Sequence, residues 1–321
     1  MRVLVTGMGG ETGTRLAQML EARSDVDAIA GCDIVPPRRR LRRSEFRRID
    51  PRHRERLRDF VLDFAPTHVA HLGVYEPASR LGPAQAAERT ELTTMVVLSA
   101  AARTGALEYV AVRSGLEIYG PRRNGTSVPD EAVPPAPRSP FGISLLGVEA
   151  AATGTARRHG IPVGTLRFAP VVGSHVPSPL GRLLRLPMVP VDALHDPPFS
   201  LLHPDDACAA MVAALERRAD GPFNIVGPGA ASPWQTARLG GRLPVPVFGP
   251  MWGPTAQAVE FMGAAIAPHV VELLRFGRTA NGAKAADVLG LDAIRSTQSV
   301  VRDLYEWAEV VPIVTAREAV A

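Results

Sequence analysis

The sequence predicts an α/β protein whose main part is a doubly wound parallel sheet, joined to a smaller C-terminal lobe. Three observations support this prediction. Short aliphatic runs alternate with stretches of helical spacing, a glycine-rich turn follows the first run, and proline becomes frequent after about residue 170. Strands that alternate with helices form parallel sheets of Rossmann type, with right-handed crossovers. The length of 321 residues is enough for a large domain and a smaller interleaved lobe.

The first unit is predicted to be a strand, a turn and a helix. Residues 2–6 form a β-branched and aliphatic run, glycines follow, and residues 15–20 have helical spacing. The later apolar runs are short and end in turns, so we expect strands buried on both faces of the sheet. Further strands are expected over 28–34, 68–74, 109–112 and 163–168, and helices over 54–64, 92–103 and 145–159.

Composition favours a soluble globular protein. Hydrophobic residues make up 46% and charged residues 21%, and no apolar run reaches the ~18 residues that cross a bilayer. The chain opens directly into a strand-like run, without the parts of a secretion signal, so a cytoplasmic location is expected. Cys32 and Cys208 are too few for a disulfide scaffold or a cysteine metal site, and we expect both thiols to be buried.

The net charge of +4 comes largely from one basic run at residues 36–48. Such a run is usually a solvated loop, and no aromatic-studded basic surface is evident, so neither nucleic acid nor a membrane is expected as a partner. His71 and His203 do not belong to a His-x-x-x-His spacing, and the sequence predicts no metal site.

The glycine-rich turn predicts a dinucleotide site. A backbone that closely approaches a pyrophosphate needs residues without Cβ, and the helix that follows directs its N-terminal amides at the negative charge. Asp33 follows twenty residues after Gly13, at the end of a second strand, where its carboxylate would bind the adenosine ribose and favour NAD. Arg38 lies close enough to neutralise a 2′-phosphate instead, so NAD and NADP both stay open. The turn contains Gly7, Gly9, Gly10, Glu11, Thr12 and Gly13.

These motifs resemble the extended short-chain dehydrogenase/reductase family, also called NAD-dependent epimerase/dehydratases, over almost the whole chain. The resemblance implies that Asp50 contacts adenine, that the chain passes the cofactor phosphates at Leu72, Gly73 and Val74, and that it passes the nicotinamide at Pro170 and Val171. It also implies the domain division: residues 1–170 and about 199–225 form the NAD(P)-binding domain, and about 171–198 and 226–321 form the substrate-binding lobe.

The catalytic residues of the resembled family are missing. Active members use a Ser or Thr after a core strand and a Tyr-x-x-x-Lys pair on the next helix. Alignment on Ile118-Tyr119-Gly120 puts Gly115 at the Ser/Thr position. Alignment with the Tyr-x-x-x-Lys motif puts Phe141 at the position of the tyrosine and Leu145 at that of the lysine. Phenylalanine cannot transfer a proton and leucine cannot hydrogen-bond a ribose. This chain therefore lacks the residues for the family's usual proton transfer.

Two serines are candidate replacements. Ser114 lies one residue from the expected position, and Ser144 lies on the helix that carries the altered pair, although serines at such places more often bond to backbone. Tyr75 and Glu117 are expected on loops near the pocket, where structural roles also fit. Tyr119 matches a structural residue of the family.

Three functions remain open. The first is an NAD(P)H-dependent ketoreductase of natural-product or antibiotic biosynthesis, whose proton comes from substrate or solvent, as in atypical aromatic-polyketide ketoreductases such as the simocyclinone ketoreductase. The second is a noncatalytic NAD(P)-binding sensor or partner protein, and the third a nucleotide-sugar epimerase or dehydratase. The first predicts a hydrophobic aromatic ketone as substrate, in a broad apolar pocket partly lined from the C-terminal lobe, and a homodimer stays open. Residues for such a pocket include Met251, Trp252, Phe261 and Phe276.

Overall fold

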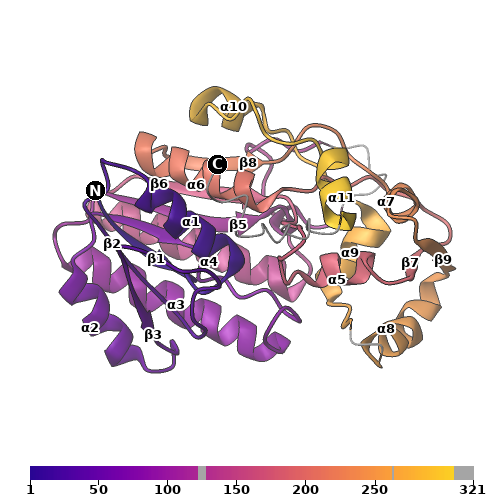
Figure 1. Cartoon of the computed structure of the whole chain (residues 1–321), viewed down its shortest axis with the longest axis horizontal. Helices are drawn as coiled ribbons and strands as arrows, with labels where there is room; N and C mark the ends of the chain where they lie inside the picture. Colours follow the sequence, from indigo (N-terminus) through magenta and orange to yellow (C-terminus); the bar gives the residue numbers. More distant parts are fainter. Residues whose placement is uncertain (122–127, 262–263, 307–321) are drawn as a thin grey trace, which may run out of the picture.

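A seven-stranded parallel sheet forms the centre of the molecule (Figure 1). The computed structural model describes residues 1–121, 128–261 and 264–306. The strand order is β3-β2-β1-β4-β5-β6-β8, so the order reverses between β1 and β4, where open α/β sheets bind their ligands. This confirms the predicted fold class. The strands are β1 (Arg2–Thr6), β2 (Ala28–Asp33), β3 (Ser44–Arg48), β4 (His68–His71), β5 (Tyr109–Gly115), β6 (Val163–Phe168) and β8 (Gly221–Ile225).

Helices cover both faces of this sheet (Figure 1). The helices α1 and α6 pack against each other in one layer, and α2, α3 and α4 form the other in sequence order. Ser139 caps α4 by accepting a hydrogen bond from the Gly142 amide, so this helix begins before the predicted residue 145. The helices are α1 (Glu11–Glu21), α2 (Arg54–Phe64), α3 (Pro83–Arg103), α4 (Pro140–His159), α6 (Pro204–Arg217) and α10 (Ala283–Leu289), with a 3₁₀ turn η1 (Leu116–Tyr119) after β5.

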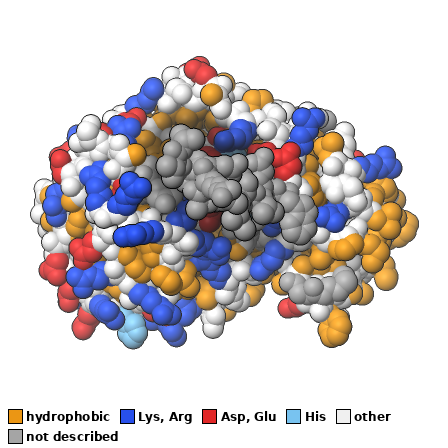
Figure 2. Space-filling model, viewed as in Figure 1, with side chains coloured by type: hydrophobic (Ala, Val, Ile, Leu, Met, Phe, Trp, Pro, Cys, Tyr) orange, Lys and Arg blue, Asp and Glu red, His pale blue; other side chains and the backbone are white. Residues whose placement is uncertain are grey.

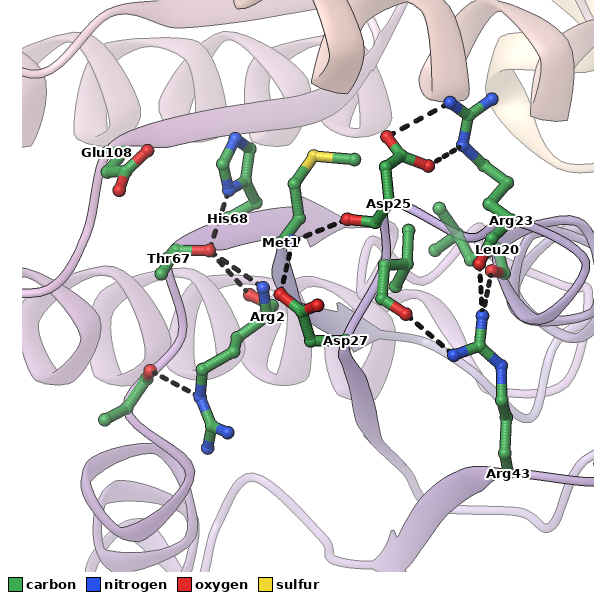
Figure 3. Close-up of polar contacts among 12 residues, drawn as sticks. Met1, Arg2, Leu20, Arg23, Asp25, Asp27, Arg43, Thr67, His68 and Glu108 are labelled. Atoms are coloured by element: carbon green, nitrogen blue, oxygen red, sulfur yellow. Dashed lines mark hydrogen bonds and ion pairs between the residues drawn. The ribbon is translucent and has the colours of Figure 1, made fainter.

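The basic run is more structured than a solvated loop. Its last part forms the edge strand β3, whose largely charged sequence hides the strand because only one side pairs with the sheet. The Arg43 guanidinium donates hydrogen bonds to the carbonyl of Leu20 in the last turn of α1 and to those of Arg23 and Val26 in the segment that follows it (Figure 3). A cation at this end also complements the helix dipole.

The smaller lobe has a hydrophobic core of its own. One cluster of buried residues draws on 3–169 and 202–289, and the other on 172–201 and 237–304. The predicted domain division stays a proposal: the two cores agree with it in part, but Ala280, Ala285 and Leu289, predicted to belong to the lobe, pack in the first core. Residues 307–321 of the predicted lobe lie outside the described residues. The lobe contains a two-stranded sheet with α5 (Pro179–Leu184), β7 (Met188–Asp192), α7 (Pro233–Leu239), β9 (Leu243–Val247), η2 (Gly249–Met251), α8 (Trp252–Phe261), α9 (Pro268–Phe276) and α11 (Thr297–Tyr305).

Apolar side chains gather at the outer end of this lobe, over α8 and β9 (Figure 2). Leu243, Phe248, Met251 and Phe261 are all more than half exposed there. The homodimer left open by the sequence stays a prediction. Within the described part of the chain, no helix is long and apolar enough to cross a membrane.

His71 is a buried structural histidine. Its ring bonds the hydroxyls of Thr6 and Thr94, each at 2.9 Å, and burial lowers its pKa from 6.5 to about 4. The unfolded chain therefore binds a proton at a higher pH than the folded chain does. Relative to a His71→Gln variant, we expect the wild-type free energy of unfolding to fall by about 3 kcal/mol as the pH falls from 6.5 to about 4. Urea unfolding at several pH values measures this, and a constant difference would contradict it.

Candidate functional site

A cleft lies at the carboxyl ends of β1, β2 and β4, beside the switch in strand order. Most of the residues predicted to hold the cofactor meet there. Gly7 has φ +70°, and a Cβ on it would lie 2.6 Å from the Leu72 carbonyl oxygen. A Cβ on Gly13 would lie 2.1 Å from the Gly7 carbonyl oxygen. The cleft needs these glycines, as a close-fitting dinucleotide cradle does. Of the predicted residues, those lining it are Gly7, Gly10, Glu11, Thr12, Gly13, Asp33, Leu72, Gly73, Val74 and Val171.

An acidic side chain lies in the first turn of α1, where a phosphate would bind. The Glu11 carboxylate is buried, and it accepts hydrogen bonds from Arg15 Nε at 2.7 Å and Arg39 Nη2 at 3.1 Å. These two cations offset its charge, so the amides of this turn keep their attraction for an anion.

Asp33 ends β2 and lines the cleft, and its contact with the adenosine ribose stays a prediction. Its Oδ1 accepts a hydrogen bond from the Ile34 amide at 2.6 Å, and burial raises the pKa of Asp33, although Arg80 acts in the opposite direction. Arg38 is exposed and does not line the cleft, since its side chain reaches toward the His175 carbonyl at 3.4 Å. The arginine beside Asp33 is Arg80, which no motif indicated.

Three other predicted contacts lie differently. Asp50 does not line the cleft because its carboxylate pairs with Arg52 at 2.8 Å and Arg89 at 3.1 Å, contacts that hold its pKa at about 2 despite partial burial. Gly9 packs against the Val35 carbonyl and also lies outside the cleft lining. Pro170 lines the neighbouring pocket, described next, and not the cleft.

Replacement of Asp33 by alanine tests the ribose contact. We expect Asp33→Ala to weaken NAD binding about ten- to hundredfold, because hydrogen bonds to a charged group contribute roughly 1.5–3 kcal/mol. NADP binding should suffer less, since the same carboxylate repels a 2′-phosphate. Calorimetric titration of both cofactors measures the difference, with the exposed Asp59→Ala as control. A greater loss for NADP would contradict the assignment.

A second pocket adjoins the cleft and shares Glu76, Arg113, Phe168 and Val171 with it. The three altered catalytic positions come together here, since Gly115, Phe141 and Leu145 all line this pocket. We call it the substrate-side pocket, because it lies next to the cofactor cleft and is closed by the smaller lobe. Its other lining residues are Ser114, Glu117, Ala169, Pro170, Leu180, His269, Val270, Leu273 and Arg278.

An ion pair fills the space at Gly115. A Cβ on Gly115 would lie 2.2 Å from Glu117 Oε2 and 3.1 Å from Leu145 Cδ1. The Glu117 carboxylate is held by Arg278 Nη1 at 3.0 Å, and Arg278 Nη2 binds Glu272 at 2.7 Å. A serine or threonine at position 115 would collide with this buried network. The loss of that side chain is thus coupled to Glu117, Leu145 and Arg278.

The two candidate serines lie in different surroundings. Ser114 is 1% exposed at the end of β5 and lines the substrate-side pocket, and its hydroxyl has no hydrogen-bond partner among the described residues. A buried hydroxyl without a partner suits contact with a bound molecule. Ser144 instead donates to the Pro140 carbonyl one turn back along α4 and lines neither the cleft nor the substrate-side pocket.

Two other residues near the motifs have structural partners. The Tyr119 hydroxyl bonds Asn224 and Arg167, and Arg167 also forms a paired hydrogen bond with Glu149. Tyr75 lines the cofactor cleft, where its hydroxyl lies 3.4 Å from Asp33.

His203 caps α6, and both cysteines are buried. Within residues 1–121, 128–261 and 264–306, no cluster of three or more His, Cys, Asp or Glu is placed to hold a metal ion.

The expected apolar lining from the C-terminal lobe is found in part: Val270 and Leu273 of α9 line the substrate-side pocket, but the predicted Met and aromatic side chains do not. Trp252 is buried in the core of the smaller lobe, and Met251, Phe261 and Phe276 are exposed, so none of them lines the substrate-side pocket. The lobe also contributes His269 and Arg278, which the sequence did not indicate. Both lie far along the chain from the glycine turn, in no recognisable motif, and only the tertiary fold brings them to the pocket.

The fold and the glycine cradle together define a dinucleotide-binding protein. Residues 3–226 match the model of the "NAD dependent epimerase/dehydratase family", and the chain belongs to this family. The family's cofactor is NAD, one of the two dinucleotides that the sequence left open. An uncharacterized protein of Mycobacterium tuberculosis and one of Mycobacterium bovis are each 31% identical over 264 residues, which is 77% of this chain and 68% of theirs.

Solved structures share the fold. The UDP-glucuronic acid 4-epimerase from Bacillus cereus, in complex with UDP-glucuronic acid and NAD, is 21% identical with a TM-score of 0.74, over 95% of this chain and 98% of that one. The UDP-glucose 4-epimerase from Thermotoga maritima, with UDP-glucose, is 20% identical with a TM-score of 0.72, over 95% and 96%.

Proposed function

We propose that this chain is an NAD-dependent enzyme that changes the oxidation state at an alcohol carbon of a nucleotide-linked sugar, in an epimerase or dehydratase type of reaction. The polar wall of the substrate-side pocket carries this proposal. Its side chains include the hydroxyl of Ser114 and the charged groups of Glu76, Arg113, Glu117 and Arg278. Such a wall suits a substrate with many hydroxyl groups better than a flat aromatic ketone.

The cleft would bind the cofactor, and the substrate-side pocket would bind the substrate. The glycine turn and the first turn of α1 would bind the cofactor's pyrophosphate, and Asp33 its adenosine ribose. Bound NAD would supply the hydride exchange. Arg113 lies between the cavities, and its only hydrogen bond among the described residues goes to the Val74 carbonyl at 3.4 Å. This leaves its charge available to an anionic group, such as a phosphate or a sugar carboxylate.

Sugar nucleotides bound to similar folds support this choice of substrate. The neighbouring structures from Bacillus cereus and Thermotoga maritima contain UDP-glucuronic acid and UDP-glucose. Ketone reduction remains the second candidate, because Phe141 and Leu145 remove the usual proton transfer while the cofactor cleft is kept.

The test is a product assay. Purified protein is incubated with NAD and a panel of UDP-sugars, and with NADH or NADPH and a panel of polycyclic phenolic ketones. We expect nuclear magnetic resonance spectra to show a new sugar nucleotide. Conversion of ketones alone would replace the proposal by the reductase function. Cofactor binding without conversion in either panel would favour the noncatalytic sensor.

A further inference from the structure

A histidine of the smaller lobe lies against Phe141, at the position that the resemblance gives to the catalytic tyrosine. The rings of His269 and Phe141 have centroids 4.8 Å apart and planes tilted by 46°. His269 belongs to the first turn of α9, is 4% exposed, and lines the substrate-side pocket together with Phe141. A histidine, a residue type that serves as general acid or base in enzymes, therefore lies beside the place of the missing phenol.

The imidazole is paired with a carboxylate. His269 Nε2 lies 3.2 Å from Glu76 Oε1, on the chain that follows β4, and Glu76 lines both the cofactor cleft and the substrate-side pocket. Among the described residues, Nδ1 of His269 has no hydrogen-bond partner. A carboxylate on one ring nitrogen fixes the ring's orientation and stabilises the imidazolium that forms when the other nitrogen takes a proton.

We propose that His269, positioned by Glu76, exchanges the proton of the reacting substrate alcohol. This inference rests on the proposed function and names its acid/base group. In the oxidation direction the substrate O–H bond breaks, and its proton forms an N–H bond on Nδ1. The C–H bond of the same carbon breaks, and its hydrogen leaves with the electron pair to bound NAD, which is reduced as the alcohol becomes a ketone. The reverse step returns proton and hydride to the ketone.

The surroundings suit this step. The charged groups around the imidazole are the carboxylates of Glu76, Glu117 and Glu272 and the cations of Arg113 and Arg278. Three carboxylates against two cations leave one negative charge to balance an imidazolium. Phe141, which packs against the ring, and Leu145 give the pocket an apolar side, and the Ser114 hydroxyl, which has no partner among the described residues, offers a second contact to the substrate oxygen.

The first test is turnover of the sugar nucleotide identified by the product assay. We expect His269→Asn to lower kcat by ~10²–10⁴, the usual contribution of general acid–base catalysis, with NAD affinity unchanged. Imidazole added to His269→Ala should restore part of the rate. His68→Gln is the matched control: another buried histidine, bonded to Thr67 at 2.9 Å at the opposite end of β4 (Figure 3), which should keep its rate. A His269→Asn variant with the wild-type rate would overturn the inference.

The second test needs no turnover. In ¹⁵N-histidine-labelled protein, His269→Asn identifies the ring signals of His269. We expect one tautomer in the wild type, with its proton on Nε2 facing Glu76, and a mixture in Glu76→Ala. A tautomer that does not depend on Glu76 would overturn the inference whatever the turnover result. A Glu76-dependent tautomer in a protein that converts none of the substrates would support the pairing and contradict the proposed function alone.

Discussion

Gly13→Ala is expected to weaken NAD binding by at least about a hundredfold, which corresponds to about 2.8 kcal/mol. The reason is geometric. The new Cβ would lie 2.1 Å from the Gly7 carbonyl oxygen and 2.8 Å from Met8 Cα, so α1 must move away from the turn. The N-terminal amides of the helix then no longer meet the pyrophosphate. Calorimetric titration with NAD measures the loss, and circular dichroism checks that the variant folds.

Gly147→Ala is the matched control. Gly147 also lies in a helix, α4, but nothing lies within 4 Å of the place where its Cβ would be. We expect this variant to bind NAD as the wild type does and to be more stable by about 0.5–1 kcal/mol, the usual cost of glycine in a helix. If Gly13→Ala bound NAD equally well, the cleft would not be the cofactor site.

Arg278→Met is expected to destabilise the protein by about 3–5 kcal/mol at neutral pH, as removal of one partner from a buried ion pair does. Arg278 is buried between Glu117 at 3.0 Å and Glu272 at 2.7 Å, and its loss leaves both carboxylates without a cation. Urea unfolding measures the change. Methionine keeps the apolar stem, so the effect reports mainly the lost charge.

The destabilisation should shrink as the pH falls. Burial already raises the pKa of Glu272, and without Arg278 that pKa should rise further. When a carboxyl group has a higher pKa in the folded than in the unfolded chain, the protein loses stability as the pH rises from the unfolded-state pKa through the folded-state pKa. We therefore expect a smaller difference from wild type at about pH 4 than at about pH 7. Arg58→Met, at an exposed pair with Asp59, should change stability little at either pH.

The cofactor half of the molecule was predictable because its signals are local. The glycines, the helix start after Gly10 and the carboxylate at Asp33 are fixed by backbone approach and by the ends of adjacent strands. The strand β3 was missed because an edge strand needs few apolar residues. Arg38 was a plausible neighbour in sequence, but its exposed side chain faces His175, and Arg80 reaches the cleft instead.

The substrate half was less predictable. The sequence showed which catalytic groups are missing, at Gly115, Phe141 and Leu145, but not what fills their space. The Glu117 carboxylate occupies the space beside Gly115, where Arg278 from the other lobe binds it. His269 meets Phe141 by the same route. Contacts between segments more than a hundred residues apart leave no spacing in one sequence that could reveal them.

One measurement tests the central claim, that this altered site still exchanges hydride with an alcohol carbon of a sugar nucleotide. Protein loaded with NAD is mixed rapidly with each UDP-sugar of the panel, and the absorbance of reduced nicotinamide is followed within a single turnover. We expect a rise in absorbance with at least one sugar, and a much slower rise in His269→Asn. Full occupancy by NAD, shown by calorimetry, with no absorbance change and no product for any sugar would contradict it.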